Sequence, residues 1–230
     1  MKSDYKNKYG KFNGNEAEYA LRALDSESTQ NRGFPWVTEF EDSFCELSGA
    51  KYSIAVNSAT SGLHAALVAA DVGPGDEVIQ PALTVIMNSL VTIACGATPV
   101  FVDINPDTWN IDTDSISKNI TSKTKAIMAV SLFGLPLDIE PIMDLAKKHN
   151  LIVIDDSAET ITGNHKGKFP GTHADMAVYS FENKKHMSSG SEGGMVITSN
   201  PDLARKVRKF SGIGYKNLTA SAGRTSLASS

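Results

Sequence analysis

Residues 179–198 read YSFENKKHMSSGSEGGMVIT, and this stretch organises the interpretation of the whole chain. It sets two adjacent lysines, Lys184 and Lys185, in a polar, glycine-rich segment between two short apolar runs typical of β-strands. Lysines attack carbonyl groups once burial or a neighbouring cation has lowered their pKa, so this pair is a candidate for covalent catalysis. A solvated turn is the alternative, because charged runs usually mark exposed faces. The segments upstream decide between these interpretations.

Upstream of the lysines, short apolar runs alternate with longer segments of helical periodicity. This alternation predicts an α/β fold with a mostly parallel central sheet and helices on both faces. The expected strands are 52–56, 76–80, 98–104, 125–132 and 151–156, and the expected helices are 60–72, 83–96, 115–120 and 138–150. Since ligands of such sheets bind at the carboxyl ends of the strands, polar residues at these ends are the candidates for a site.

Three regions differ in pattern. Residues 1–35 contain a helix predicted over 15–25 and then an arm with Gly33 and Pro35, which we interpret first as a linker. Residues 36–214 begin with a second amphipathic helix, 36–48, and continue as the α/β domain. Residues 215–230 form a tail that ends in the low-complexity sequence AGRTSLASS.

The composition narrows the class of protein. With 41% hydrophobic and 21% charged residues, the chain resembles an ordinary soluble globular protein, and its net charge of -4 argues against nucleic acid or an anionic membrane as a partner. We see neither a signal peptide nor an apolar run of roughly 18 residues, so a cytoplasmic location is expected. Cys45 and Cys95 are expected to be free thiols, and no metal site is predicted.

The first polar strand end is NSATSG at residues 57–62, which opens a helix. Small residues at a helix start leave backbone N–H groups available, so this turn is suited to a phosphate. A plain N-cap by Ser58 or Thr60 is the alternative. The glycine motifs GxGxxG and GxxxxGK[ST] are absent near this turn, which argues against a dinucleotide site and against a P-loop.

The second and third strand ends carry acids and a hydroxyl. The run 151–156 ends in Asp155 and Asp156, which alternation sends to opposite sides of the strand, so one of them is expected to face a pocket. A helix cap is the alternative role for these acids. The run 177–181 places Ser180 five residues before Lys185, within reach of the same anion as the 57–62 turn.

Five ordered motifs add a specific resemblance. NSATSGLHAAL, GDEVIQPALT, GATPVFVDI, VIDDSAE and SFENKKHMSSGSEGG resemble, in order and spacing, motifs of the DegT/DnrJ/EryC1/StrS family of sugar aminotransferases, which depend on pyridoxal phosphate (PLP). The similarity runs from about residue 13 to about residue 214. It implies the large domain of the fold type I PLP enzymes, with the usual small C-terminal domain absent or truncated in this chain.

The resemblance assigns residues around the cofactor. Ser58, Ala59 and Thr60 match the phosphate-binding turn, and Ser180 matches the serine that contacts the phosphate. The family usually has an aromatic residue over the cofactor ring, whereas this chain has Val85, which implies weaker stacking or aliphatic contact.

The same comparison assigns the chemical groups. Asp156 matches the aspartate that faces the pyridine nitrogen, and Glu159 matches the residue near the 3-hydroxyl. Lys185 matches the Schiff-base lysine, with Lys184 as the second choice and His186 as a neighbour without an assigned role. Ser191 is one residue more than the family's commoner spacing after this lysine, so the loop there is expected to differ in shape.

The resemblance implies transfer of an amino group from L-glutamate to a nucleotide-linked keto sugar, in amino-sugar and surface polysaccharide biosynthesis. It also implies a two-fold homodimer with sites at the interface. Two alternatives stay open: a truncated or catalytically idle PLP-binding module, and a PLP-dependent sugar dehydratase, in which histidine replaces the lysine.

Overall fold

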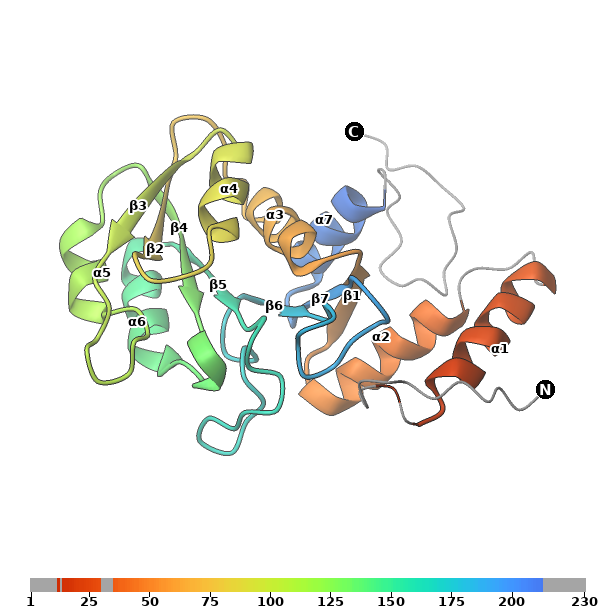
Figure 1. Ribbon diagram of the computed structural model, residues 1–230. Helices are drawn as coiled ribbons and strands as arrows, with labels where there is room; N and C mark the ends of the chain where they lie inside the picture. Colours follow the sequence, from red (N-terminus) through yellow and green to blue (C-terminus); the bar gives the residue numbers. More distant parts are fainter. Residues whose placement is uncertain (1–11, 13, 30–34, 213–230) are drawn as a thin grey trace.

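The computed structural model describes residue 12 and residues 14–29 and 35–212. Its helices and strands alternate along the chain, as the apolar pattern predicts (Figure 1). In order they are α1 (Glu16–Thr29), α2 (Pro35–Ser48), β1 (Tyr52–Val56), α3 (Ala59–Ala69), β2 (Glu77–Pro81), α4 (Met87–Ala94), β3 (Thr98–Val102), α5 (Thr113–Asn119), β4 (Thr124–Val130), the short 3-10 helix η1 (Leu132–Gly134), α6 (Ile139–His149), β5 (Ile152–Asp156), β6 (Met176–Ser180), β7 (Gly194–Thr198) and α7 (Pro201–Ser211).

The strands form one sheet in the order β1-β7-β6-β5-β4-β2-β3. Its neighbours pair in parallel from β6 to β3, whereas β7 pairs antiparallel with both β6 and β1. Two reversals cancel, so β1 runs in the same direction as the parallel strands. The prediction of a mostly parallel α/β sheet is therefore confirmed, and the carboxyl ends of every described strand except β7 meet at one edge.

Helices cover both faces of the sheet. On one face, α3, α4 and α7 bury side chains such as Leu63, Val91 and Val207 against alternate strand residues. On the other face, α5 and α6 bury Ile116 and Ile142 over β2 to β5, and α2 packs over β6 and β7. Figure 1 shows α5 and α6 toward the β3 end of the sheet and α2 toward its β1 end, with α4, α3 and α7 following one another from the β3 side to the β1 side. Complete burial of β6 and β7 fits strands that are covered on both sides.

The N-terminal helices and the last helix refine the expectations. Helix α1 extends beyond the predicted 15–25, and Leu21 and Leu24 on its apolar side remain 55% and 70% exposed. Pro35 begins α2 rather than breaking it, which suits proline because the first helical N–H has no partner within the helix. Gly33 and the tail 215–230 lie outside the described residues. Helix α7 was not predicted.

Candidate active site at the carboxyl edge of the sheet

The polar segments singled out in the sequence follow strands that end at the same edge of the sheet. The connection after β1 leads directly into α3, and the connection after β5 begins with a buried serine, Ser157. The segment after β6 carries the two lysines. Because all of these strands point the same way, side chains more than a hundred residues apart in sequence gather at one place.

The start of α3 combines a capped helix terminus with a tight packing contact. Ser58 is the N-cap, and its hydroxyl oxygen accepts a hydrogen bond of 3.1 Å from the Ser61 backbone N–H. A side chain on Gly62 would place its Cβ 2.8 Å from a Val178 side-chain carbon, so the helix lies close against the sheet. Thr60 is exposed at the same turn. The capping interpretation of Ser58 is confirmed, and the N-terminal end of the helix dipole faces the carboxyl edge.

Ser180 and the α3 turn lie on either side of Gly194. Gly194 pairs with Val56 at the end of β1 and with Ser180 at the end of β6. A Cβ on Gly194 would lie 2.6 Å from the Ser58 carbonyl carbon, so any residue other than glycine at this position would displace the turn. The Ser180 hydroxyl accepts a hydrogen bond of 3.3 Å from the Glu182 backbone N–H. The first and third polar strand ends are thus neighbours in space.

The two aspartates at the end of β5 point to opposite faces of the sheet, as alternation predicts. Asp155 accepts a hydrogen bond of 3.1 Å from the Ser131 hydroxyl, and Asp156 accepts one of 2.9 Å from the Asn88 side-chain amide of α4. Each is 2% exposed. Burial raises the pKa of the Asp155 carboxyl to about 7. Burial also raises the pKa of the Asp156 carboxyl, while the Asn88 hydrogen bond and the charge of Lys185 oppose that rise.

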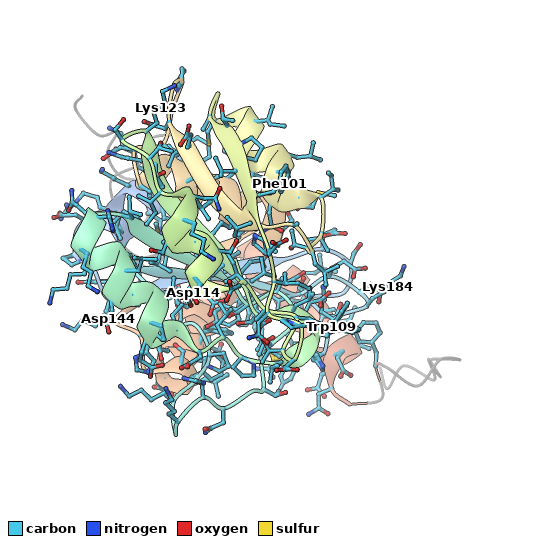
Figure 2. The ribbon with its side chains drawn as sticks, turned by 90° about the vertical axis from the view of Figure 1, so that its left-hand side faces the viewer. Phe101, Trp109, Asp114, Lys123, Asp144 and Lys184 are labelled. Carbon is cyan, nitrogen blue, oxygen red and sulfur yellow. The ribbon has the colours of Figure 1, made fainter. Side chains whose placement is uncertain are left out.

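Lys185 lies inside the site, whereas Lys184 does not. The Lys185 Nζ donates a hydrogen bond of 3.1 Å to Glu159 Oε1, and the two side chains are 23% and 27% exposed. The other oxygen of Glu159 accepts from the Phe133 backbone N–H at 3.0 Å. Lys184 is exposed, and Figure 2 shows its side chain extending outward at the rim. The structure therefore brings Asp156, Glu159 and Lys185 together.

Val85 and Asn88, at the start of α4, differ in their relation to the group of Asp156, Glu159 and Lys185. Val85 is 44% exposed, and its backbone carbonyl accepts from the Asn88 N–H at 3.4 Å. Asn88 is completely buried against Asp156 and was missed in the sequence. The available signal was a lone amide in the apolar run 83–96, LTVIMNSLVTIACG, where an unpaired polar group would be costly.

The loop after Lys185 returns to the sheet through several internal hydrogen bonds. Phe181 N–H donates to the Gly193 carbonyl at 2.8 Å, and the Ser189 hydroxyl donates to the Glu192 carbonyl at 2.7 Å. Ser191, the additional residue noted in the sequence, is exposed at the outer part of this loop. His186 is also exposed.

A second polar cluster lies at the start of α6. One carboxylate oxygen each from Asp138 and Glu140 and the His165 Nε2 lie within 4.8 Å of one another, which is an arrangement able to hold a cation. The Lys166 ammonium already donates to both carboxylates, at 2.9 and 3.0 Å. Its hydrogen bond is the main reason that the pKa of the Glu140 carboxyl falls below its usual range. We therefore interpret this cluster as an ion-pair network that fixes the 165–168 turn.

Comparison with known proteins relates this arrangement to a family. The sequence profile described as the DegT/DnrJ/EryC1/StrS aminotransferase family matches residues 11–227. The GDP-perosamine synthase of Caulobacter vibrioides is 44% identical over 204 residues, which cover 89% of this chain and 54% of that protein. The chain thus spans about half the length of this relative. In the described residues, no helix has the length and apolarity needed to cross a membrane.

Solved structures agree with the sequence relationship. The X-ray structure of an aminotransferase from Psychrobacter cryohalolentis superposes with a TM-score of 0.86 at 38% identity, covering 95% of this chain and 55% of that one. The crystal structure of NtdA from Bacillus subtilis, described with bound cofactor PMP, superposes with a TM-score of 0.80 at 31% identity, covering 92% and 52%. The shared fold therefore covers nearly the whole of this chain and about half of each of these two relatives.

Proposed function

The chain belongs to the DegT/DnrJ/EryC1/StrS aminotransferase family, and on this premise we propose that it carries the PLP site of an aminotransferase that moves an amino group from L-glutamate to a nucleotide-linked keto sugar. Such a reaction serves amino-sugar biosynthesis, including that of surface polysaccharides. The observation that carries the proposal is the grouping of Lys185, Glu159 and Asp156 at the edge of the sheet. The comparison with NtdA, whose described cofactor is PMP, supports the choice of cofactor.

The residues present fit a phosphorylated pyridine. We assign the phosphate to the turn of Ser58, Ala59 and Thr60 and to the Ser180 hydroxyl. The first backbone N–H groups of a helix have no acceptor within the helix, and at the start of α3 these groups and the helix dipole both favour an anion. Gly194 supports this assignment because it keeps the approach to the turn free of a side chain.

Asp156 suits the pyridine nitrogen. A buried carboxylate without a cation is costly, which is why burial raises the pKa of Asp156. A ring N–H⁺ placed beside it would remove that cost, and the carboxylate would in turn keep the nitrogen protonated. Asn88 holds one Asp156 oxygen, and the Ala158 backbone N–H donates to the other at 3.1 Å, so the orientation of the group is fixed from both sides.

Lys185 and Glu159 suit the reacting end of the cofactor. When bound, PLP supplies an aldehyde that captures amines and a ring that withdraws electrons. The Lys185 Nζ is the amine that would attach to it. In the first half of the reaction this nitrogen would take the proton from the donor's α-carbon and deliver it to C4′ of the cofactor, and in the second half it would move a proton from C4′ to the acceptor carbon that receives the amino group. Glu159 orients the amine through their 3.1 Å hydrogen bond, and it would face the 3-hydroxyl of the bound cofactor. We assign the contact over the ring to the aliphatic side chain of Val85, which is 44% exposed.

A reconstitution experiment tests the proposal. Adding PLP to the protein should produce an absorbance band that borohydride removes, with the label found on Lys185 by peptide mapping. Lys184→Ala is the matched control, because Lys184 is the exposed neighbour and should leave the labelling intact. Attachment to another side chain in Lys185→Ala, at the wild-type level, would refute the assignment.

Two further measurements separate the alternatives. Conversion of the PLP form by L-glutamate to the pyridoxamine form is expected for an aminotransferase and not for an idle binding module. An amino sugar formed from a nucleotide-linked keto sugar is expected for an aminotransferase and not for a dehydratase. Lys185 favours the aminotransferase over the dehydratase, since the lysine is retained.

The proposed assembly is a two-fold homodimer. Ile86, the N-cap of α4, and Leu90 and Ile93 of that helix are 61%, 49% and 58% exposed, at helical spacing. Apolar side chains in such a row indicate a protein interface. Light scattering after gel filtration should give twice the chain mass, and Leu90→Asp should shift it to the monomer.

We also propose a cytoplasmic location, which the free thiols of Cys45 and Cys95 support.

A further inference from the structure

Trp109 and Phe133 form an exposed pair of aromatic rings at the carboxyl edge. They are 52% and 68% exposed, and their ring centroids lie 6.0 Å apart at an interplanar angle of 70°. By contrast, the rings of Phe44, Tyr179 and Phe181 pack together in the core under α2. Two large rings left side by side in solvent are the kind of surface that proteins use for binding. We call Trp109 and Phe133 the aromatic pair.

The backbone is arranged to hold the aromatic pair in place. Trp109 and Phe133 both adopt the left-handed conformation, with φ of 61° and 52°, which is strained for a residue other than glycine. The buried side chain of Asn110 joins the two turns: it accepts from the Leu132 N–H and donates to the Leu135 carbonyl, both at 3.2 Å. The surrounding contacts therefore sustain strain that positions two exposed rings.

The aromatic pair borders the proposed reaction centre. The Phe133 backbone N–H donates to Glu159 Oε2 at 3.0 Å, and Glu159 Oε1 accepts from the Lys185 Nζ at 3.1 Å. A single carboxylate thus separates the Phe133 backbone from the reacting amine. In Figure 2, Trp109 and Lys184 lie toward the same side of the molecule, away from Asp144 of α6.

Resting on the proposed function, we propose that the aromatic pair binds the hexose ring of the acceptor sugar. The carbonyl carbon that receives the amino group must come next to Lys185, so the hexose is the part of the acceptor that lies within reach of Phe133. The diphosphate and ribose hold the nucleobase farther away. The C–H groups on one face of a pyranose match the negative faces of aromatic rings, and this contact orients the ring without requiring a charged partner.

Fluorescence of Trp109 tests the proposal directly. The sequence contains two tryptophans, so Trp36→Phe leaves Trp109 as the single indole. This parent is titrated with GDP-mannose, UDP-glucose and dTDP-glucose, each against its nucleoside diphosphate. We expect a saturable change of emission with at least one nucleotide sugar and an affinity about fivefold or more above that for the matching diphosphate. Equal effects of diphosphate and nucleotide sugar would show that the rings hold the base, and no effect of any probe would also overturn the proposal.

Variants of the second ring provide the matched comparison. Phe133→Ala should lower the affinity for the nucleotide sugar about fivefold and leave that for the diphosphate unchanged, whereas Phe133→Tyr, which keeps a ring, should restore it. Phe210→Ala removes a 44% exposed ring from α7 and is expected to change neither. Circular dichroism checks that each variant is folded. If Phe133→Ala alters only the mass in solution, the rings form a protein interface and the proposal is wrong.

The proposed function is tested on the same Trp36→Phe parent, independently of the role of the aromatic pair. Borohydride labelling of Lys185 and the glutamate half-reaction do not require the acceptor sugar. If Lys185 is labelled and the half-reaction occurs, but the titration shows no preference for nucleotide sugars, the role of the aromatic pair is refuted and the proposed function is not. A hexose-dependent signal without labelling of Lys185 refutes the proposed function instead.

Discussion

Asn88 of α4 and Asp156 of β5, 68 positions apart in sequence, are joined by a buried hydrogen bond of 2.9 Å. The Asn88 amide is completely buried, and the same nitrogen lies 3.0 Å from the Met128 sulfur. An amide in this position both fixes the carboxyl group and compensates its charge. This hydrogen bond connects α4 to Asp156, the residue proposed to face the pyridine nitrogen.

Replacing this amide should destabilise the protein and disturb the site. We expect Asn88→Ala to lower the free energy of unfolding by about 1–3 kcal/mol, since a buried acceptor loses its donor. Urea denaturation measures this change, and the absorbance of the PLP-loaded protein as a function of pH reports whether the ring proton is lost at lower pH. Val85→Ala, in the exposed segment just before α4, is the control for stability. An Asn88→Ala protein as stable as Val85→Ala would contradict the expectation.

Asp155 should make stability depend on pH. Its folded-state pKa of about 7 lies above the ordinary value of 3.8, because the carboxyl is buried. Between these values the unfolded chain releases the proton and the folded chain keeps it, so the stabilisation is complete below about pH 4 and declines as pH rises toward 7. The limiting slope is about 1.4 kcal/mol per pH unit.

Asp155→Asn isolates this contribution. The difference in free energy of unfolding between wild type and Asp155→Asn, from urea denaturation between pH 4 and pH 8, should shift in favour of the variant as the pH rises, because asparagine does not ionise. Asp156 is retained in both proteins, so its own titration largely cancels. A difference that stays constant over this range would show that Asp155 does not titrate there.

Gly194 should be required for the phosphate site. Its Cβ would meet the Ser58 carbonyl carbon at 2.6 Å and the Ala59 nitrogen at 2.7 Å, so Gly194→Ala must push the α3 turn away. Overpacking of this kind costs about 1–3 kcal/mol, and the Kd for PLP should rise about tenfold. Gly73→Ala, where a Cβ meets nothing within 4 Å, is the matched control. Equal PLP affinities of the two variants in an absorbance titration would exclude this role.

The buried ion pair between α7 and α2 should be a large determinant of stability. Arg208 donates to both oxygens of Glu41 at 2.7 Å, and the side chains are 12% and 4% exposed. Arg208→Ala removes the cation beside a buried carboxylate and should cost about 3–5 kcal/mol. Arg205→Ala removes a partly exposed pair with Asp202 on the same helix and should change stability by less than about 1 kcal/mol. Thermal unfolding of both variants gives the comparison.

Periodicity was sufficient for the sheet because its strands are short apolar runs separated by turn residues. The antiparallel direction of β7 could not be obtained in this way, since burial on both faces erases the alternation that would distinguish it. Helix α7 was missed although Asn200, whose side chain caps it, and Pro201 at its start are ordinary helix signals. Local patterns therefore predicted elements better than their directions.

The site was predictable where a strand end carried a functional group. Alternation predicted that one of Asp155 and Asp156 faces a pocket, whereas the choice of Asp156, like the contrast between Lys185 and Lys184, came from the family motif and its spacing. Asn88 and the aromatic pair could not be found because their roles depend on contacts across the sheet edge and on left-handed backbone conformations. Such contacts leave no periodic trace in the sequence.

Because β7 runs antiparallel to β6, the loop that carries Lys185 lies outside the paired strands. The peptide between β6 and β7 leaves the sheet and re-enters it at the same rim, so a residue gained or lost near Ser191 changes the length of a surface excursion and leaves strand alignment intact. Natural variation can thus reshape the surroundings of Lys185, the amine proposed to react, without disturbing the core. Enzymes built on this plan are free to diversify the substrates they accept while keeping one scaffold.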